Sequence, residues 1–256
     1  MTDLSQFSLS GKSFVITGAS SGIGAAVSGF LADAGAQVLL LARRQERLDI
    51  AVESINNSEH RRAHALAADL SDRETIPEVA ASCTEILGQV DGVVNAAGVN
   101  LRQPEDDISL ESWDQTLNLN LAVPFFFSRE FVNGMRERRF GRIINIASLQ
   151  SSRAFENGLA YGASKGGICQ LTRAMAQAWS RYGITANAIA PGFFPTELTA
   201  PVFSDPDREE AIAAQTAIGR NGKLEDLCGP MIFFASSASS YITGQTLYID
   251  GGFTAK

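Results

Sequence analysis

Tyr161 and Lys165 are the residues whose types and spacing most directly indicate chemistry. They lie four positions apart, so in a helix both side chains project from one face and their polar ends can share a site. A tyrosine phenol with its ordinary pKa of about 10 exchanges protons poorly at neutral pH, whereas a neighbouring ammonium group favours its ionised form. The pair therefore predicts proton transfer by Tyr161, with Lys165 lowering its pKa. Two unrelated surface residues are the structural alternative.

Ser148 and Asn120 precede this pair and could act with it. Ser148 follows the largely apolar run 142–147, so a strand there would place its hydroxyl at the carboxyl edge of a parallel sheet, where ligands bind. The hydroxyl could bond a substrate oxygen beside Tyr161, or it could only cap a turn or helix. Asn120 lies four residues before Pro124, whose missing N–H leaves the Asn120 carbonyl without its helical partner. This predicts a kink with a free acceptor, or only a proline that breaks an apolar helix.

A glycine-rich turn near the N-terminus predicts a phosphate-binding site. Residues 17–24 read T-G-A-S-S-G-I-G and connect an apolar run to a helical pattern. Gly18 permits a tight turn, Gly22 lets the backbone approach a pyrophosphate, and Gly24 allows close helix packing. The helix N-terminus adds N–H donors for an anion, and the two serines add hydroxyl groups. A turn without a ligand is the alternative. The predicted contacts are Gly18, Ser20, Ser21, Gly22, Ile23 and Gly24.

The elements that must position these residues follow from hydrophobic periodicity. Apolar residues recur at helical spacing over 23–34, Gly35 ends that pattern, and 38–41 is a short continuous apolar run. Similar short runs occupy 14–16, 63–68, 92–94, 143–146, 185–189 and 247–249, and a further helix is expected over 160–181. Buried strands joined by helices specify a parallel sheet with helices on both faces. We therefore expect a single α/β domain over residues 1–256, a doubly wound Rossmann-type fold.

Several motifs in this order resemble the short-chain dehydrogenase/reductase family. They are the T-G-x-x-x-G-x-G pattern of 17–24, Asp69-Leu70, Asn95-Ala96-Ala97-Gly98, Asn120, Ser148, Tyr161-x-x-x-Lys165, Pro191-Gly192 and Thr196. The resemblance covers nearly the whole chain, and the one departure is Ala96, where the family has a second asparagine. It implies a dinucleotide-dependent oxidoreductase with Asn120, Ser148, Tyr161 and Lys165 as catalytic residues.

The resemblance also implies individual contacts to the cofactor. Asp69 would accept a hydrogen bond from the adenine amino group, Leu70 would contribute its backbone, and Thr196 would hold the nicotinamide carboxamide. The Asn120 carbonyl would hold a water that links Lys165 to solvent. A turn carboxylate at the strand end is the alternative for Asp69. The remaining implied cofactor contacts are Asn95, Ala96, Gly98, Tyr161, Lys165, Pro191, Gly192 and Phe194.

The end of the second expected strand bears on which dinucleotide binds. Sites that prefer NAD place a carboxylate there for the ribose hydroxyls, whereas a 2′-phosphate requires a basic residue. This chain has Ala42 at that position and Arg43 next, which favours NADP(H). NAD remains the alternative, because Arg43 also belongs to the charged run 43–47, which could be a solvated helix start.

Composition limits the class of partner. The 256 residues contain 28 acidic and 21 basic residues, a net charge of −7, which disfavours nucleic acid and anionic membranes. The three cysteines form no CxxC pair, and His60 and His64 lack companion ligands, so we expect solvated or packed histidines and no metal site. Residues 1–12 contain no apolar run of signal-peptide length, and 23–42 is better explained as a helix and a strand than as a membrane span. We expect a cytoplasmic protein.

The predicted reaction is reversible hydride transfer between NADP(H) and a carbonyl or secondary alcohol of a small molecule. Segments 99–102 and 171–176 resemble gluconate and deoxygluconate dehydrogenases more than 3-oxoacyl carrier-protein reductases, which remain an alternative, and a dinucleotide sensor without turnover is another. The expected substrate lid, about 193–217, mixes apolar and acidic residues and indicates no particular ligand. Arg102 could clamp a substrate carboxylate, or it could be a loop arginine paired with Glu105 or Asp106.

The family resemblance also implies a homotetramer that pairs the helices expected around 120–138 and 161–181. Those segments contain more aromatic residues than one sheet face needs to bury, although burial in the core is the alternative. The residues concerned are Phe125, Phe126, Phe127, Phe131, Trp179 and Tyr182.

Overall fold

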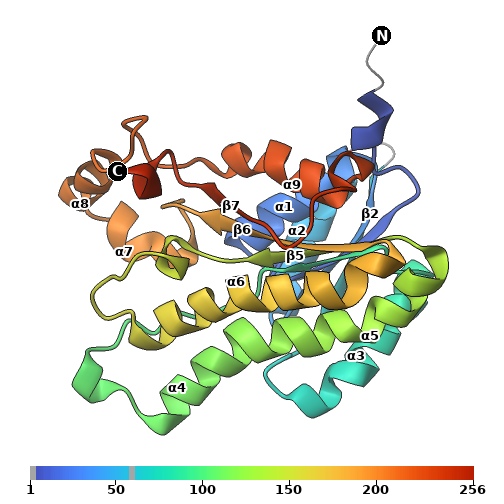
Figure 1. The fold of residues 1–256 in the computed structure, drawn as a ribbon, viewed down its shortest axis with the longest axis horizontal. Coiled ribbons are helices and arrows are strands. Elements are labelled where there is room, and N and C mark those ends of the chain that lie inside the picture. The colour runs from blue at the N-terminus through green and yellow to red at the C-terminus, as the bar shows by residue number, and fades with distance from the viewer. Residues whose placement is uncertain (1–3, 58–60) are drawn as a thin grey trace.

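A seven-stranded parallel sheet runs through the middle of the computed structural model, which describes residues 4–57 and 61–256 (Figure 1). The spatial order is β3-β2-β1-β4-β5-β6-β7. The strands are β1 (Ser13–Thr17), β2 (Gln37–Ala42), β3 (Arg62–Ala67), β4 (Gly92–Asn95), β5 (Gly141–Ile146), β6 (Ile184–Pro191) and β7 (Thr246–Ile249). Each apolar run expected to be a strand coincides with one of them, although the run 63–68 extends one residue beyond β3. The predicted doubly wound α/β fold is confirmed.

The order of the strands changes direction at β1, which lies between β2 and β4. Thr17 is paired with Leu41 on one side and with Asn95 on the other. The Thr17 hydroxyl accepts hydrogen bonds from the backbone N–H groups of Ala96 and Ala97, both at 3.1 Å, which ties the segment after β4 to the end of β1. Such a switch point opens a crevice at the carboxyl ends of the strands, where ligands bind in open α/β sheets.

Helices cover both faces of the sheet (Figure 1). One face carries α1 (Gly22–Asp33), α2 (Gln45–Asn56) and α9 (Cys228–Ala235). The opposite side carries α3 (Ile76–Leu87), α4 (Leu110–Leu117), α5 (Val123–Arg138) and α6 (Leu159–Trp179). Two short helices, α7 (Ala200–Phe203) and α8 (Pro206–Ala213), lie together in the segment between β6 and α9 (left in Figure 1).

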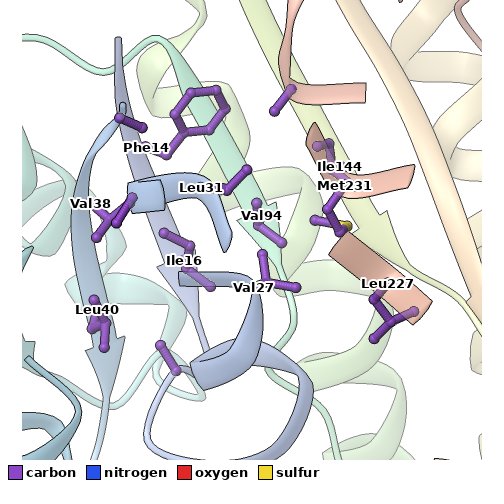
Figure 2. Close-up of a cluster of buried hydrophobic side chains, with 14 of the residues drawn as sticks. Phe14, Ile16, Val27, Leu31, Val38, Leu40, Val94, Ile144, Leu227 and Met231 are labelled. Carbon is purple, nitrogen blue, oxygen red and sulfur yellow. The ribbon is translucent and has the colours of Figure 1, made fainter. Parts of the chain in front are cut away.

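The larger hydrophobic core lies between β1, β2, β4 and the helices α1 and α9 (Figure 2). Phe14, Leu31 and Leu40 are fully buried there. The Phe14 ring occupies the space above Gly92, where a Cβ atom would lie only 2.1 Å from the ring. Burial of each such side chain contributes roughly 1.5–3 kcal/mol to the free energy of folding. This packing therefore holds in place the strands whose ends carry the site residues.

Candidate active site

A cleft of about 570 Å³ opens where the carboxyl ends of β1, β2, β4, β5 and β6 meet. Residues from segments far apart in the sequence line this one cleft, as the predicted sheet requires. The sequence-predicted residues that line it are Gly18, Ser20, Ser21, Gly22, Ile23, Gly24, Arg43, Asp69, Leu70, Ala96, Gly98, Ser148, Tyr161, Lys165, Pro191, Gly192, Phe194 and Thr196.

The glycine-rich turn between β1 and α1 has the geometry of a phosphate-binding loop. Gly18 has a φ of +67°, and a Cβ atom there would lie 2.7 Å from the Ala97 backbone. A Cβ atom on Gly24 would lie 2.4 Å from the Gly18 carbonyl oxygen, so both positions require glycine. The N-cap residue Ser21 makes no side-chain hydrogen bond to α1, which leaves the first N–H groups of the helix to an anionic ligand. These donors fit the phosphate groups of a dinucleotide.

Two arginines line the cleft directly after β2. The guanidinium group of Arg43 is 3.9 Å from the Asp69 carboxylate and is mostly exposed. Arg44 donates to the hydroxyl groups of Ser20 at 3.1 Å and Ser21 at 3.3 Å. The sequence argument chose Arg43, with the solvated run 43–47 as its alternative. The structure places both arginines in the cleft lining and puts Arg44 in contact with the phosphate-binding turn.

Asp69 lies two residues after the end of β3 and lines the cleft. Its carboxylate accepts a hydrogen bond from the Ser71 backbone N–H at 2.9 Å. Burial raises the pKa of Asp69, but hydrogen bonds from Ser71 and the charge of Arg43 lower it below its usual value. Asp69 is thus a strand-end turn carboxylate, as the alternative predicted, and also an ionised acceptor in the cleft.

The predicted pair, Tyr161 and Lys165, lies on the first turns of α6. The Lys165 side chain is only 5% exposed, and its Nζ donates to the Ile146 carbonyl oxygen at 2.6 Å. That Nζ lies 5.6 Å from the centroid of the Tyr161 ring. Burial lowers the pKa of Lys165 to about 8. The predicted partnership through one helix face is therefore present.

Tyr161 differs from expectation in the direction of its pKa. Burial raises the pKa of Tyr161, and this outweighs the lowering by a hydrogen bond with Ser148 and by the charge of Arg102. The expected net lowering by Lys165 is wrong for this structure, because desolvation of the phenol dominates. In this state Tyr161 is a protonated phenol, suited to donate a proton.

Ser148 has the capping contact that the sequence analysis gave as one of its two alternatives, and it also lines the cleft with Tyr161. Its hydroxyl accepts from the Gln150 backbone N–H at 3.1 Å and caps the 3-10 turn Leu149–Ser151. The same hydroxyl is near enough to the phenol to act on the pKa of Tyr161, which it lowers. A capping bond fixes the rotamer of a serine, so the turn holds this hydroxyl in place beside Tyr161.

Asn120 lies in a π-helical turn, Asn118–Ala122, in which the Val123 N–H donates to the Asn118 carbonyl. The predicted interruption of the helix before Pro124 is therefore present. Asn120 does not line the cleft. Its side chain accepts from the Val99 N–H and donates to the Val99 carbonyl, both at 2.8 Å, and donates to the Ser164 hydroxyl at 3.0 Å. It thus ties the segment after β4 to α6.

Comparison with known proteins agrees with this geometry. Residues 18–254 match the family model described as enoyl-(acyl carrier protein) reductase. The gluconate 5-dehydrogenase of Gluconobacter oxydans (strain 621H) is 37% identical over 97% of this chain and 96% of that protein. The chain belongs to the short-chain dehydrogenase/reductase family. It is therefore an oxidoreductase that acts on CH–OH groups.

Two other members of the family are similar over their whole length. The 2-dehydro-3-deoxy-D-gluconate 5-dehydrogenase of Dickeya dadantii (strain 3937) is 36% identical over 99% of each chain. The crystal structure of a gluconate 5-dehydrogenase from Burkholderia cenocepacia J2315, in complex with NADP and tartrate, has a TM-score of 0.93 at 34% identity and covers 99% of each chain. Neither the fold nor the length of this chain departs from these short-chain dehydrogenases.

Asn95 was expected to contact the cofactor, but in this short-chain dehydrogenase/reductase it does not line the cleft. It is 4% exposed, and its amide donates to the Ser128 hydroxyl at 2.9 Å and to the Asn145 side chain at 2.8 Å. Because side chains alternate along a strand, Asn95 at the end of β4 points under α5 and not toward the glycine-rich turn. Its contribution is to hold β4, β5 and α5 together.

Arg102 lines the cleft and lies within electrostatic reach of Tyr161. Its backbone has a φ of +50°, and its guanidinium group donates to the Leu198 carbonyl oxygen at 3.0 Å. Among the ion pairs of the described residues, Arg102 has none with Glu105 or Asp106. The alternative of a paired loop arginine is therefore not what the structure shows.

Some contacts in the cleft were not expected from the sequence, although Phe193 and Glu197 belong to the expected lid 193–217. Phe155 and Phe193 line one end of the cleft and pack against each other and against Phe253, with ring centroids about 6 Å apart. Glu197 also lines the cleft, and it accepts a hydrogen bond from Ser21 of the phosphate-binding turn, 176 residues earlier in the chain. Neither contact follows from local spacing.

The aromatic residues expected on α5 and α6 divide into two groups. Phe127, Phe131 and Trp179 are buried in the core, so the core alternative holds for them. Phe125, Phe126 and Tyr182 are half-buried. Phe125 stacks on Trp179 with a centroid distance of 6.2 Å.

Neither a metal-binding cluster nor a membrane-spanning helix occurs within residues 4–57 and 61–256. In these ranges no group of His, Cys, Asp and Glu side chains is arranged to hold a metal ion, and no helix is long and apolar enough to cross a membrane. His64 is hydrogen-bonded with Gln37 at 2.9 Å, whereas the expectation for His60 lies outside the described residues.

Proposed function

We propose that this protein is an NADP(H)-dependent dehydrogenase that interconverts a keto group and a secondary hydroxyl group on a small sugar acid. The observation that carries the proposal is the Tyr161 hydroxyl in the cleft, with the Ser148 hydroxyl and the Arg102 charge beside it. In this arrangement Tyr161 would protonate a substrate oxygen, Ser148 would orient that oxygen, and Arg102 would bind a carboxylate.

The donors at the opposite end of the cleft fit NADP(H). Ser20 and Arg44 lie beside the uncapped N-terminus of α1, and Arg43 lines the same cleft. Ala42 supplies no carboxylate for a ribose. Two guanidinium groups after β2 suit a 2′-phosphate better than a hydroxyl group. The Burkholderia enzyme of the same fold is complexed with NADP. NAD(H) remains the second candidate cofactor.

The bound nicotinamide supplies or accepts the hydride, and the protein handles the proton. In the reducing direction the Tyr161 hydroxyl donates its proton to the substrate oxygen, which Ser148 holds by a hydrogen bond. The Lys165 ammonium then stabilises the phenolate that forms, at 5.6 Å from the ring centroid. In the oxidising direction the phenolate accepts the proton from the alcohol. Asn120 positions Lys165 and Tyr161 by bonding Val99 and Ser164.

A carboxylate on the substrate is supported by Arg102, which has no acidic partner among the described ion pairs. The relatives named as gluconate and deoxygluconate dehydrogenases and the tartrate complex agree with an acidic, hydroxylated substrate. The family model described as an enoyl-(acyl carrier protein) reductase keeps acyl thioesters as the second candidate substrate.

A matched substrate screen tests the proposal. Sugar acids, their neutral polyol counterparts, 3-oxoacyl thioesters and bulky ketones are each assayed with NADPH, NADH and the oxidised cofactors. The proposal predicts the highest kcat/KM for a keto or hydroxy sugar acid with the NADP(H) pair. Preference for a thioester, or equal use of acids and their neutral counterparts, would contradict it.

For assembly and location we propose a cytoplasmic homotetramer. The half-buried Phe125, Phe126 and Tyr182 on α5 and after α6 support an interface there. Light scattering at micromolar concentration measures the assembly, and a monomer would contradict it. Cell fractionation tests the location.

A further inference from the structure

Glu197 connects the expected lid to the glycine-rich turn and to the arginines that follow β2. It begins the 3-10 turn Glu197–Thr199 that follows Thr196. Its Oε2 accepts from the Ser21 hydroxyl and from Arg44, both at 3.0 Å, and its Oε1 is paired with Arg47. A hydrogen bond from Arg44 holds the pKa of Glu197 below its usual value, so this side chain is a carboxylate at neutral pH.

The donors that Glu197 engages are those that a cofactor phosphate would need. Arg44 donates hydrogen bonds to both serines of the glycine-rich turn and to the Glu197 carboxylate. A carboxylate and a phosphate are both acceptors for guanidinium and hydroxyl donors, and two anions cannot share the same Arg44 group without repulsion. A phosphate that binds here must displace the carboxylate.

The neighbours of Glu197 keep it at this place. On one side, a Cβ atom on Gly22 would lie 3.2 Å from the Thr196 side chain, so Thr196 rests on the phosphate-binding turn. On the other side, the Leu198 carbonyl accepts from Arg102 at 3.0 Å. The consecutive residues 196–198 are thus all in contact with the walls of the cleft. These contacts hold the Glu197 carboxylate beside Arg44.

The position of Arg44 indicates which phosphate is affected. Arg44 follows β2, whose carboxyl end holds the adenosine ribose in dinucleotide-binding sheets. A carboxylate there opposes a 2′-phosphate and does not oppose a 2′-hydroxyl group. Because β2 ends in Ala42, the carboxylate beside the arginines comes from the lid and not from the strand.

We propose that Glu197 sets the cofactor preference of this enzyme, by competing as an internal anion with the 2′-phosphate of NADP(H) for Arg44 and Ser21. The inference rests on the proposed function in one respect, namely that the cleft binds a nicotinamide dinucleotide. Glu197 lowers the affinity for NADP(H), leaves that for NAD(H) nearly unchanged, and so narrows the preference that the two arginines create.

Direct binding measurements on the full-length protein test this. The dissociation constants of NADPH and NADH are measured by fluorescence titration for the parent, Glu197→Gln and Glu209→Gln. Glu209 lies on α8 in the same segment, exposed and outside the cleft lining, so its variant makes the same change of net charge without touching the donors. It controls for the general attraction of a less acidic protein for a more highly charged cofactor.

The expected result is that the dissociation constant of NADPH falls about 5-fold in Glu197→Gln. Breaking one half-exposed ion pair of Glu197 costs the parent about 1.5- to 5-fold in NADPH affinity, and the variant does not bear this cost. NADH binding changes by less than about 2-fold, and Glu209→Gln resembles the parent for both. Equal tightening for both cofactors, or weaker or unchanged NADPH binding, would overturn the inference while dinucleotide binding stands. A parent protein that binds neither cofactor would overturn the proposed function, and the inference with it.

Discussion

Replacing Lys165 by methionine is expected to stabilise the protein at neutral pH and to do so less as the pH rises. Lys165 is buried, and its pKa falls from the ordinary 10.5 to about 8. The unfolded chain therefore holds more protons than the folded one between pH 8 and 10.5, and the parent gains stability as the pH rises through that window. Below it, the folded state bears the full cost of burying the ammonium group.

The size of the effect follows from the two pKa values. Burial of the charged form costs about 3 kcal/mol at pH 7 and about 1 kcal/mol at pH 10, so the advantage of Lys165→Met should shrink by about 2 kcal/mol between these pH values. The methionine variant also loses the hydrogen bond from Nζ to the Ile146 carbonyl. That loss of about 1 kcal/mol is nearly the same at both pH values, so the difference between them carries the test.

The assay is urea unfolding at both pH values for the parent, Lys165→Met and Lys223→Met. Lys223 is exposed and far from the catalytic pair in sequence, so its variant controls for a loss of one positive charge. The free energy of unfolding of this control should differ from the parent by the same amount at pH 7 and at pH 10. A Lys165→Met variant whose difference from the parent is also independent of pH would refute the reasoning, as would one that gains stability over the parent only at high pH.

Three further predictions concern the site itself. Tyr161→Phe should bind NADPH with a nearly unchanged dissociation constant and turn over at least about 10²-fold more slowly, because only the proton donor is removed; turnover within a factor of a few of the parent would contradict its role. Arg43→Ala and Arg44→Ala should each weaken NADPH by about 10- to 150-fold in titration and NADH much less, and equal losses for both cofactors would contradict a 2′-phosphate site. Arg102→Gln should raise the KM of a keto acid by about tenfold and leave that of a neutral ketone of similar size unchanged in steady-state assays, whereas unchanged KM values for all acids would leave neutral ketones as the substrate class.

The fold could be predicted from the sequence because the strands are short apolar runs and helical patterns separate most of these runs. Parallel strands with both faces covered need no alternation of polar residues, so continuous apolar runs such as 38–41 identify them. Once the strands are known, their carboxyl ends must meet at one edge. This is why Gly18, Ser148 and Asp69 were correctly expected to share one cleft.

Side-chain direction at a strand end was harder to predict. Val94 packs with α1 on one face, so the next residue, Asn95, must face the other. The alternation of side chains along β4 follows from any strand. It predicts the direction of Asn95 only once it is known which helix covers which face of the sheet. The contacts of Arg44 with Glu197 depend on how the segment after β6 folds back, which no local pattern indicates.

The charge of the cleft is opposite to that of the molecule as a whole. The chain has a net charge of −7, whereas the cleft lining includes Arg43, Arg44, Arg102 and Lys165 against Asp69 and Glu197. A basic cleft in an acidic surface concentrates the field where an anionic dinucleotide must bind and repels the same anion elsewhere.

These charges act on different parts of a bound complex, so their effects can be separated. Arg43 and Arg44 lie at the end of β2, and Lys165 lies beneath the Tyr161 ring near β5. Arg102 contacts Leu198 in the segment after β6, which is the expected substrate lid. Affinity for the cofactor, proton transfer and affinity for an acidic substrate should therefore respond to different variants. The carboxylate of Glu197 joins this expected lid to the arginine and serine that we propose to bind the 2′-phosphate, so its variant should report on both.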